Sequence, residues 1–120
     1  MTETFYGNFS GSSAYRLVSK EGENFVFEWT IEDNHPHLDG HFDSWPILPG
    51  ASQVGLVLET LAYSLQKSVK IVHVKKVKFM AMIQPTRTLN IVLKCKTPTE
   101  VHWEIKDVEK TYSKGAFLYE

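Results

Sequence analysis

The fold is decided by residues 51–67, which read ASQVGLVLETLAYSLQK. Apolar residues recur here at three- and four-residue spacings, the periodicity of an amphipathic helix. They are Val54, Val57, Leu58, Leu61 and Leu65. Because Leu56 and Ala62 widen the apolar face, only a narrow polar strip remains. A helix of this kind needs cover on most of its circumference, and we expect it to lie at the centre of the fold.

Strand patterns flank this helix on both sides. Apolar and polar residues alternate in two segments before it and four after it, at 14–20, 24–31, 69–83, 89–96, 101–108 and 111–119. The first two are separated by the turn-forming stretch Glu21-Gly22-Glu23. Each strand must bury one face, and the helix must be buried on most sides. The order of two strands, one helix and four strands therefore predicts an α+β fold in which one long antiparallel sheet curls round a central helix.

Composition limits the classes of protein to which the chain can belong. Its 120 residues, 42% of them hydrophobic, suit one domain over residues 1–120. Lys and Arg total 13 against 14 Asp and Glu, so we expect neither nucleic acid nor membrane as a partner. The single cysteine, Cys95, and a first segment without the basic start and apolar run of a secretory signal favour a cytoplasmic location. No apolar run approaches the roughly 20 residues that span a bilayer.

The segment 32–50 is a long loop in this interpretation, and such loops usually carry function. It holds three of the histidines, His35, His37 and His41, among prolines. Gly50 ends it where the helix begins, and the unpaired backbone N–H groups there attract developing negative charge. Removing a proton beside a thioester carbonyl needs a base near neutral pKa and donors aimed at the carbonyl oxygen. His41 and the Gly50 amide are candidates for these two tasks.

The motif Gly40-His41-Phe42, followed by PILPG at 46–50 and then a helix, resembles the bacterial 3-hydroxyacyl-[acyl carrier protein] dehydratases of fatty acid synthesis. Further matches to that family are Asn34, Pro36, Lys78, Phe79 and Pro85. The resemblance covers about residues 31–119 and is strongest over 40–50. The sequence PILPG also resembles the corresponding motif of the aryl-polyene dehydratase branch.

This resemblance implies a hotdog fold, a homodimer with acyl tunnels at the subunit interface, and dehydration of a 3-hydroxyacyl thioester to the trans-2-enoyl form without a cofactor. His41 matches the catalytic histidine of the family, and Gly50 matches the glycine whose N–H binds the thioester carbonyl. We take the substrate-binding set to be Phe42, Pro49, Gly50, Ala51 and Gly55.

One position departs from the family pattern. The second catalytic residue, a helix Glu or Asp from the other subunit, would fall at position 55, where this chain has Gly55. Glu59 projects from the same helix face about one turn further on, about 6 Å away, and is the candidate displaced acid. Alternatively, the space at Gly55 admits a water, and His41 is assisted by another residue of the loop. The candidates for that assistance are His37, Asp39 and Asp43.

Three functions therefore stay open: a dehydratase, a hotdog thioesterase in which Glu59 activates water, and an acyl-binding protein without turnover, which Gly55 favours.

Two further features concern partners and metals. The lysines Lys75, Lys76 and Lys78 suit docking of an acidic carrier protein, against the alternative of a solvated strand face. A metal site is a further alternative, because an extended segment would place alternate residues on one face. The residues concerned are His35, His37, Asp39 and His41. Pro36 and Gly40 bend that segment, so we expect no metal there.

Overall fold

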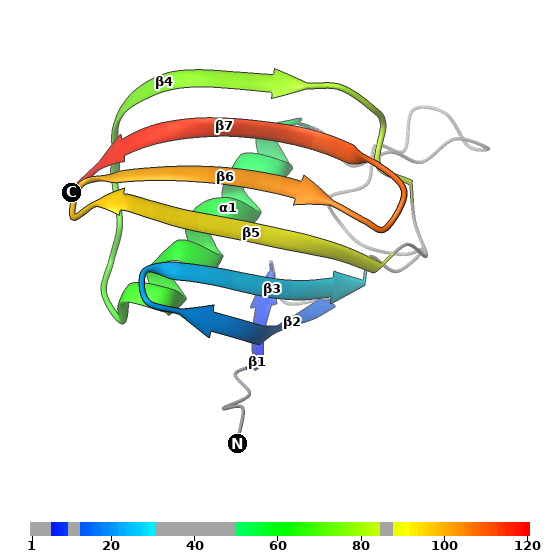
Figure 1. The fold of residues 1–120 in the computed structure, drawn as a ribbon, viewed down its shortest axis with the longest axis horizontal. Helices are drawn as coiled ribbons and strands as arrows, with labels where there is room; N and C mark the ends of the chain where they lie inside the picture. The colour runs from blue at the N-terminus through cyan, green and yellow to red at the C-terminus, as the bar shows by residue number, and fades with distance from the viewer. Residues whose placement is uncertain (1–5, 10–12, 31–49, 85–87) are drawn as a thin grey trace.

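The computed structural model describes residues 6–9, 13–30, 50–84 and 88–120. These residues form one helix and seven strands, which curl round the helix (Figure 1). Their bounds are β1 Tyr6–Phe9, β2 Ser13–Glu21, β3 Asn24–Thr30, α1 Gly50–Leu65, β4 Ile71–Phe79, β5 Thr88–Thr97, β6 Glu100–Lys106 and β7 Thr111–Tyr119. No helix in this part of the chain has the length and apolar character that crossing a membrane requires.

The strands form a single sheet in the order β1-β2-β3-β5-β6-β7-β4, and every neighbouring pair is antiparallel. Strand β4 follows the helix in the chain but lies at the edge of the sheet, beyond β7 (Figure 1). An edge strand presents one row of backbone N–H and C=O groups that its own sheet leaves unpaired.

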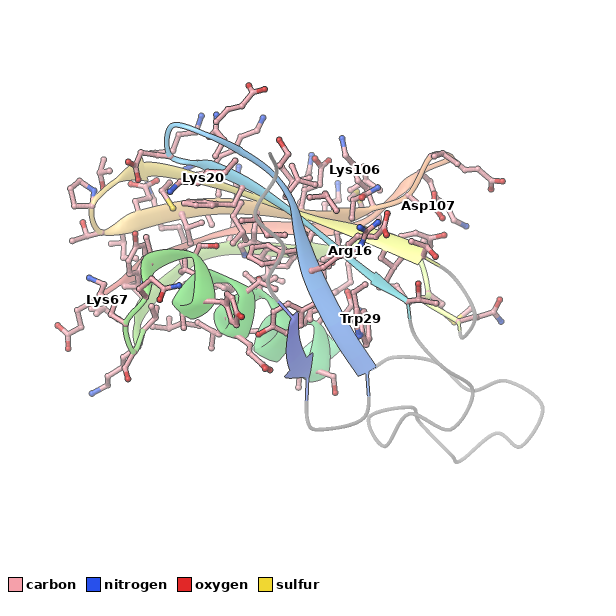
Figure 2. All side chains as sticks on the ribbon, turned by 90° about the horizontal axis from the view of Figure 1, so that it is seen from below. Arg16, Lys20, Trp29, Lys67, Lys106 and Asp107 are labelled. Carbon is pink, nitrogen blue, oxygen red and sulfur yellow. The ribbon has the colours of Figure 1, made fainter. Side chains whose placement is uncertain are left out.

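Helix α1 packs against one face of this sheet, and Figure 2 shows it there with Lys106 on the opposite side. Strands β3, β5 and β6 each alternate buried and less buried residues, so their apolar side chains all face the helix. The helix buries a stripe at the spacing expected of an amphipathic helix, made of Gln53, Leu56, Val57, Thr60 and Leu61. Its other side is only partly covered, and Ala51 is exposed.

The end of α1 is set by its backbone. Gln66 adopts a left-handed φ of 56°. The Gln66 N–H donates to the Tyr63 carbonyl at 3.4 Å and the Lys67 N–H to the Ala62 carbonyl at 3.2 Å, which is the pattern of a Schellman motif. The helix therefore stops at Leu65 rather than at the predicted residue 67.

The predicted elements are otherwise confirmed with two corrections. The sequence pattern predicted two strands before the helix, whereas the structure has three, because the four residues of β1 are too few for a periodicity to show. The strand predicted over 69–83 ends at Phe79. Beyond it, the N–H groups of Met80 and Ala81 both donate to the Tyr112 carbonyl, at 2.8 and 3.2 Å, which ends the regular ladder.

Candidate functional site

Several predicted site residues lie outside the described residues. These are His41, Phe42 and Pro49, together with His35, His37, Asp39 and Asp43 of the same segment. The part of the site that the structure describes is the start of α1, its partly exposed face and the adjoining strands.

The start of α1 is shaped by a contact between Gly50 and Phe79. A Cβ atom built on Gly50 would lie 2.8 Å from Cζ of Phe79, so a side chain at this position would displace the ring. The Phe79 side chain comes from the end of β4 and is 50% exposed. Because the first turn of α1 carries no acidic residue, no carboxylate of that turn competes for the positive end of the helix. A helix start can stabilise a negative charge, and this role of Gly50 stays a prediction.

Glu59 is held by a residue of its own chain. The Tyr15 hydroxyl donates to Oε1 of Glu59 at 3.1 Å. Tyr15 belongs to β2 and is 1% exposed, with Phe27 and Tyr63 packed edge-on against its ring. Burial raises the pKa of Tyr15, and the adjacent Glu59 charge raises it further, so the phenol remains a donor throughout the neutral range.

Gly55 and Glu59 both lie on the partly buried face of α1, beside the fully buried stripe. The Tyr15 contact anchors the Glu59 carboxylate toward β2. A phenol that donates to a carboxylate is a suitable partner for its ionised form, which is the form that accepts protons.

The three lysines predicted to dock a carrier protein do not have equivalent surroundings. All three lie on β4 and are exposed. The Lys75 ammonium contacts Oε2 of Glu100 at 3.1 Å, and the same oxygen lies 2.8 Å from Nε2 of His102. His102 and then Lys75 lower the pKa of the Glu100 carboxyl through these hydrogen bonds. Lys76 lines a cavity on the sheet, and Lys78 lies opposite a lysine of β7.

The model of the ApeI-like family, described as ApeI dehydratase, matches residues 17–116. The chain belongs to the ApeI-like dehydratase family. This membership confirms the resemblance to the dehydratases and supports an activity of the dehydratase type. No curated protein sequence matches the chain.

Solved structures show which fold this ApeI-like chain has. The dehydratase heterocomplex ApeI:P from Xenorhabdus doucetiae is similar with a TM-score of 0.76 and 18% identity, covering 98% of each chain. An uncharacterised protein from Erwinia carotovora subsp. atroseptica is similar with a TM-score of 0.65 and 21% identity, and the match covers 99% of this chain and 97% of that protein. Thioesterase superfamily member 2 from Mus musculus is similar with a TM-score of 0.66 and 15% identity, and the match covers 88% of this chain and 80% of that protein. At these identities the likeness shows the fold alone, and it confirms the hotdog fold.

Two features of this ApeI-like site were not predicted. The sequence indicated Phe79 only as a family match, and nothing in it placed the ring against Gly50. Tyr15 was counted as a strand residue, although it is the hydrogen-bond donor to Glu59. Tyr15 and Glu59 are 44 positions apart in the chain, so only the packing of α1 on β2 brings them together.

Proposed function

We propose that this single hotdog domain, residues 1–120, is a dehydratase that converts a 3-hydroxyacyl thioester to the trans-2-enoyl thioester and water. The observation that carries the proposal is the start of α1. There Gly50 opens the helix without an acidic side chain in its first turn and lies under the Phe79 ring. The ApeI-like family match over residues 17–116 supports the same reaction class.

The proposed chemistry gives each residue one task. His41 removes the proton on the carbon next to the thioester carbonyl, and the Gly50 N–H donates to the carbonyl oxygen as negative charge grows there. The hydroxyl on the next carbon then leaves as water, with a proton supplied by a carboxylic acid. We assign that acid to Glu59, which replaces the acid missing at Gly55. The acyl group lies against Phe42, Pro49, Ala51 and Gly55.

The edge strand β4 supports a second chain as partner. Beyond it the described chain has no further strand, and its apolar side chains Val72 and Val74 are 59% and 46% exposed. Exposed apolar edges are liable to pair with another chain. We assign this edge to a second copy, so that the acyl slot lies at the subunit interface. Since the Xenorhabdus doucetiae relative is described as a heterocomplex, a different hotdog chain is the alternative partner.

An acyl carrier protein in the cytoplasm is the proposed donor of the substrate. Lys76 and Lys78 are exposed on the same edge strand, where an acidic protein surface would be attracted. Lys75 contributes less because Glu100 already neutralises part of its charge.

A hotdog thioesterase is the second candidate function, and one observation favours it. The Tyr15 hydroxyl donates to Glu59, an arrangement that suits an ionised carboxylate acting as a base on water. In that reaction water attacks the thioester carbonyl, the C–S bond breaks and a free thiol leaves.

Incubation of purified protein with 3-hydroxyacyl thioesters of several chain lengths distinguishes these functions. Enoyl absorbance without thiol release supports the dehydratase, whereas thiol release supports the thioesterase. Neither product, with retained binding of the thioester, would show an acyl-binding protein and contradict the proposal.

The variant His41→Ala tests the proposed base. We expect enoyl formation to fall by at least about 100-fold, because a positioned general base contributes that much or more. Circular dichroism should be unchanged, and His102→Ala, which changes a histidine of β6 that the proposed mechanism does not use, should keep wild-type turnover. Unchanged turnover in His41→Ala would remove this residue from the mechanism.

A further inference from the structure

The sheet carries two buried polar side chains without a hydrogen-bond partner. They are Trp103 of β6, which is 2% exposed, and Ser113 of β7, which is 0% exposed. Neither the Nε1 atom of Trp103 nor the Oγ atom of Ser113 forms a hydrogen bond with any of the described residues. Buried polar groups in folded proteins are nearly always paired, so these two groups indicate a partner that the chain itself does not supply.

Both side chains face α1 rather than the outer surface of the sheet. Trp103 alternates along β6 with His102 and Glu104, which belong to the less buried row of that strand. Ser113 lies directly opposite Ile105, whose side chain is part of the core. Residues at opposed positions of neighbouring strands project to the same face of a sheet, so the Ser113 hydroxyl also points to the helix side.

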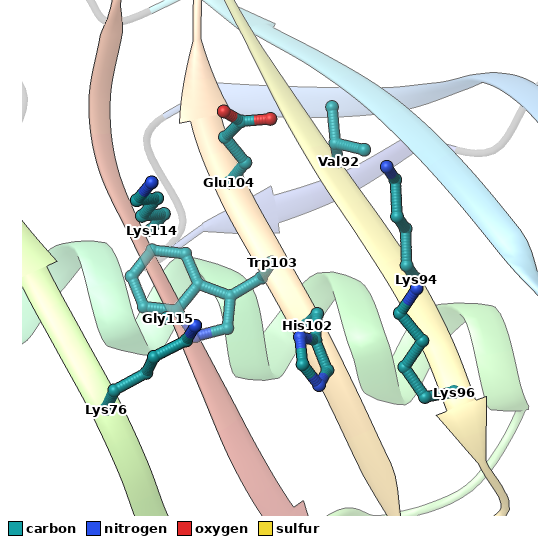
Figure 3. A pocket seen from close by; sticks show the side chains of 9 residues that line it. All are labelled: Lys76, Val92, Lys94, Lys96, His102, Trp103, Glu104, Lys114 and Gly115. Carbon is teal, nitrogen blue, oxygen red and sulfur yellow. The ribbon is translucent and has the colours of Figure 1, made fainter.

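Figure 3 shows the outer face of the same strands, with α1 behind the sheet. Exposed lysines line a cavity of about 220 Å³ there, among them Lys76, Lys94 and Lys114. Trp103 is part of the strand that forms the floor of this cavity, but its indole lies on the α1 side. The unpaired groups therefore belong to the space between the sheet and the helix.

Ser113 lies beside the start of α1. In the ladder between β4 and β7 it is directly opposite Phe79, and the ring of Phe79 would lie 2.8 Å from a Cβ on Gly50. The Ser113 hydroxyl is therefore on the same face of the sheet as the ring that packs against the helix start. An acyl group with its carbonyl at the Gly50 N–H and its chain directed between α1 and the sheet would pass Ser113 next.

The Trp103 indole lies next to Ser113 in the same layer of side chains. Gly115 is opposite Trp103 and two residues from Ser113 on β7, a separation of about 7 Å along a strand. A Cβ on Gly115 would lie 2.9 Å from Cε2 of the indole, the carbon bonded to Nε1. Phe117, on the other side of Gly115 from Ser113, packs against the indole with ring centroids 5.6 Å apart. The glycine thus lets the indole lie over β7, between Phe117 and Ser113.

We propose that Ser113 and Trp103 give the site specificity for an acyl group whose chain carries a hydrogen-bonding oxygen, such as a hydroxyl, over a plain hydrocarbon chain. The Trp103 N–H donates to this oxygen, and the Ser113 hydroxyl donates to it or accepts from it. A hydrocarbon chain in the same place would leave both groups unpaired, and sites of this kind discriminate strongly against the analogue that lacks the oxygen. The inference rests on the proposed function, because it takes an acyl thioester as the ligand.

Binding of probes that cannot react tests the pair without requiring turnover. The probes are acyl-pantetheine analogues in which a methylene group replaces the thioester sulfur, with a chain that is unsubstituted or carries one hydroxyl at successive positions beyond the third carbon. Calorimetry with the full chain should show that one hydroxylated probe binds about tenfold or more tightly than the unsubstituted probe of the same length. The indole N–H signal of Trp103, assigned with Trp103→Phe, should shift more with that probe. Equal affinities for all probes, or no binding of any, would overturn the proposal.

A matched pair of serine variants separates specificity from a structural role. Ser113→Ala should reduce the preference for the hydroxylated probe by about threefold or more. It should not lower the urea midpoint of the ligand-free chain, because it removes a buried hydroxyl that has no partner among the described residues. The control Ser64→Ala removes a hydroxyl of α1 that already donates to the Thr60 carbonyl at 2.8 Å, and it should leave the preference unchanged. An unchanged preference in Ser113→Ala, or an equal loss in both variants, would contradict the inference.

The failure of this inference is distinguishable from the failure of the proposed function. Enoyl formation from 3-hydroxyacyl thioesters, together with equal binding of all probes, would keep the dehydratase and exclude the role of Ser113 and Trp103. A preference that depends on Ser113 without any enoyl formation would keep this role and exclude the dehydratase.

Discussion

At the scale of single residues, the contact between Tyr15 and Glu59 decides how the helix carboxylate can act. The phenol is buried and fixed by aromatic neighbours, whereas Glu59 is only partly buried. The phenol donates to one carboxylate oxygen of Glu59, Oε1. The pair therefore positions a group that would otherwise sample several rotamers.

Glu59→Gln and Tyr15→Phe separate these two roles. If Glu59 transfers the proton, Glu59→Gln should lower kcat by about 10²- to 10⁴-fold, because the amide cannot take part in proton transfer. Tyr15→Phe keeps the carboxylate and should lower kcat by a smaller factor, with little change in KM. Full activity in Glu59→Gln, measured by enoyl and thiol formation together, would eliminate Glu59 as acid or base.

Two buried phenols predict how stability depends on alkaline pH. Burial raises the pKa of Tyr119 to about 12, and Tyr15 is shifted in the same direction. A folded-state pKa above the unfolded value means that the folded protein keeps a proton which the unfolded chain loses. The contribution of these two phenols to the free energy of unfolding should thus be constant below about pH 10 and fall above it, by about 1.4 kcal/mol per pH unit for each phenol. Urea unfolding from about pH 9 to about pH 11.5 should show a shallower decline for Tyr119→Phe than for the wild type.

At the scale of elements, the contact between β4, β6 and β7 leaves no room for a side chain at Gly115. A Cβ there would lie 2.6 Å from the Lys76 carbonyl oxygen, which is backbone and cannot rotate away. Gly115→Ala should therefore lower the free energy of unfolding by about 1–3 kcal/mol or more.

Gly22→Ala is the matched control for this glycine. Gly22 lies in the β2–β3 turn with a φ of 60° and open space around it, so the cost there is backbone strain alone, about 1 kcal/mol. Urea denaturation of both variants measures the difference, and an equal loss of stability would mean that the crowding at Gly115 is relieved by a shift of β4.

The periodicity of residues 51–67 was enough to predict α1, because a helix buries a stripe that recurs along the sequence. Strands β3, β5 and β6 were predictable in the same way, because buried and less buried residues alternate regularly along them. Strand pairing could not be predicted in this way. The cavity formed by Lys76, Lys94 and Lys114 depends on the register between strands, which no local pattern encodes.

The candidate site was predictable only in part. Gly50 at the helix start follows from the Pro-Gly junction, and the structure has α1 beginning at that residue. The Phe79 ring over Gly50 and the Tyr15 hydroxyl on Glu59 required tertiary packing. The role of His41 stays a prediction from the motif, since this residue lies outside the described part of the chain.

At the scale of the whole molecule, all the exposed large apolar side chains of the described residues except Val108 lie on β4 or just after it. Val72, Val74, Phe79, Met80 and Met82 are each at least 40% exposed. Phe79 ends the strand and lies against Gly50, so the edge that would pair with a second chain continues into the candidate site. Assembly and activity are therefore linked in the proposed function.

The double variant Val72→Lys/Val74→Lys tests that link. Charged side chains on an edge strand oppose pairing with another chain, so we expect this variant to sediment as a monomer where the wild type sediments as a dimer. Enoyl formation should fall together with the dimer fraction, because the acyl slot is proposed to need both subunits. Val108→Lys adds charge at a 98% exposed residue of the β6–β7 turn, outside β4, and should alter neither property. A variant that stays dimeric, or a monomer with full turnover, would show that β4 is not the interface on which the active site depends.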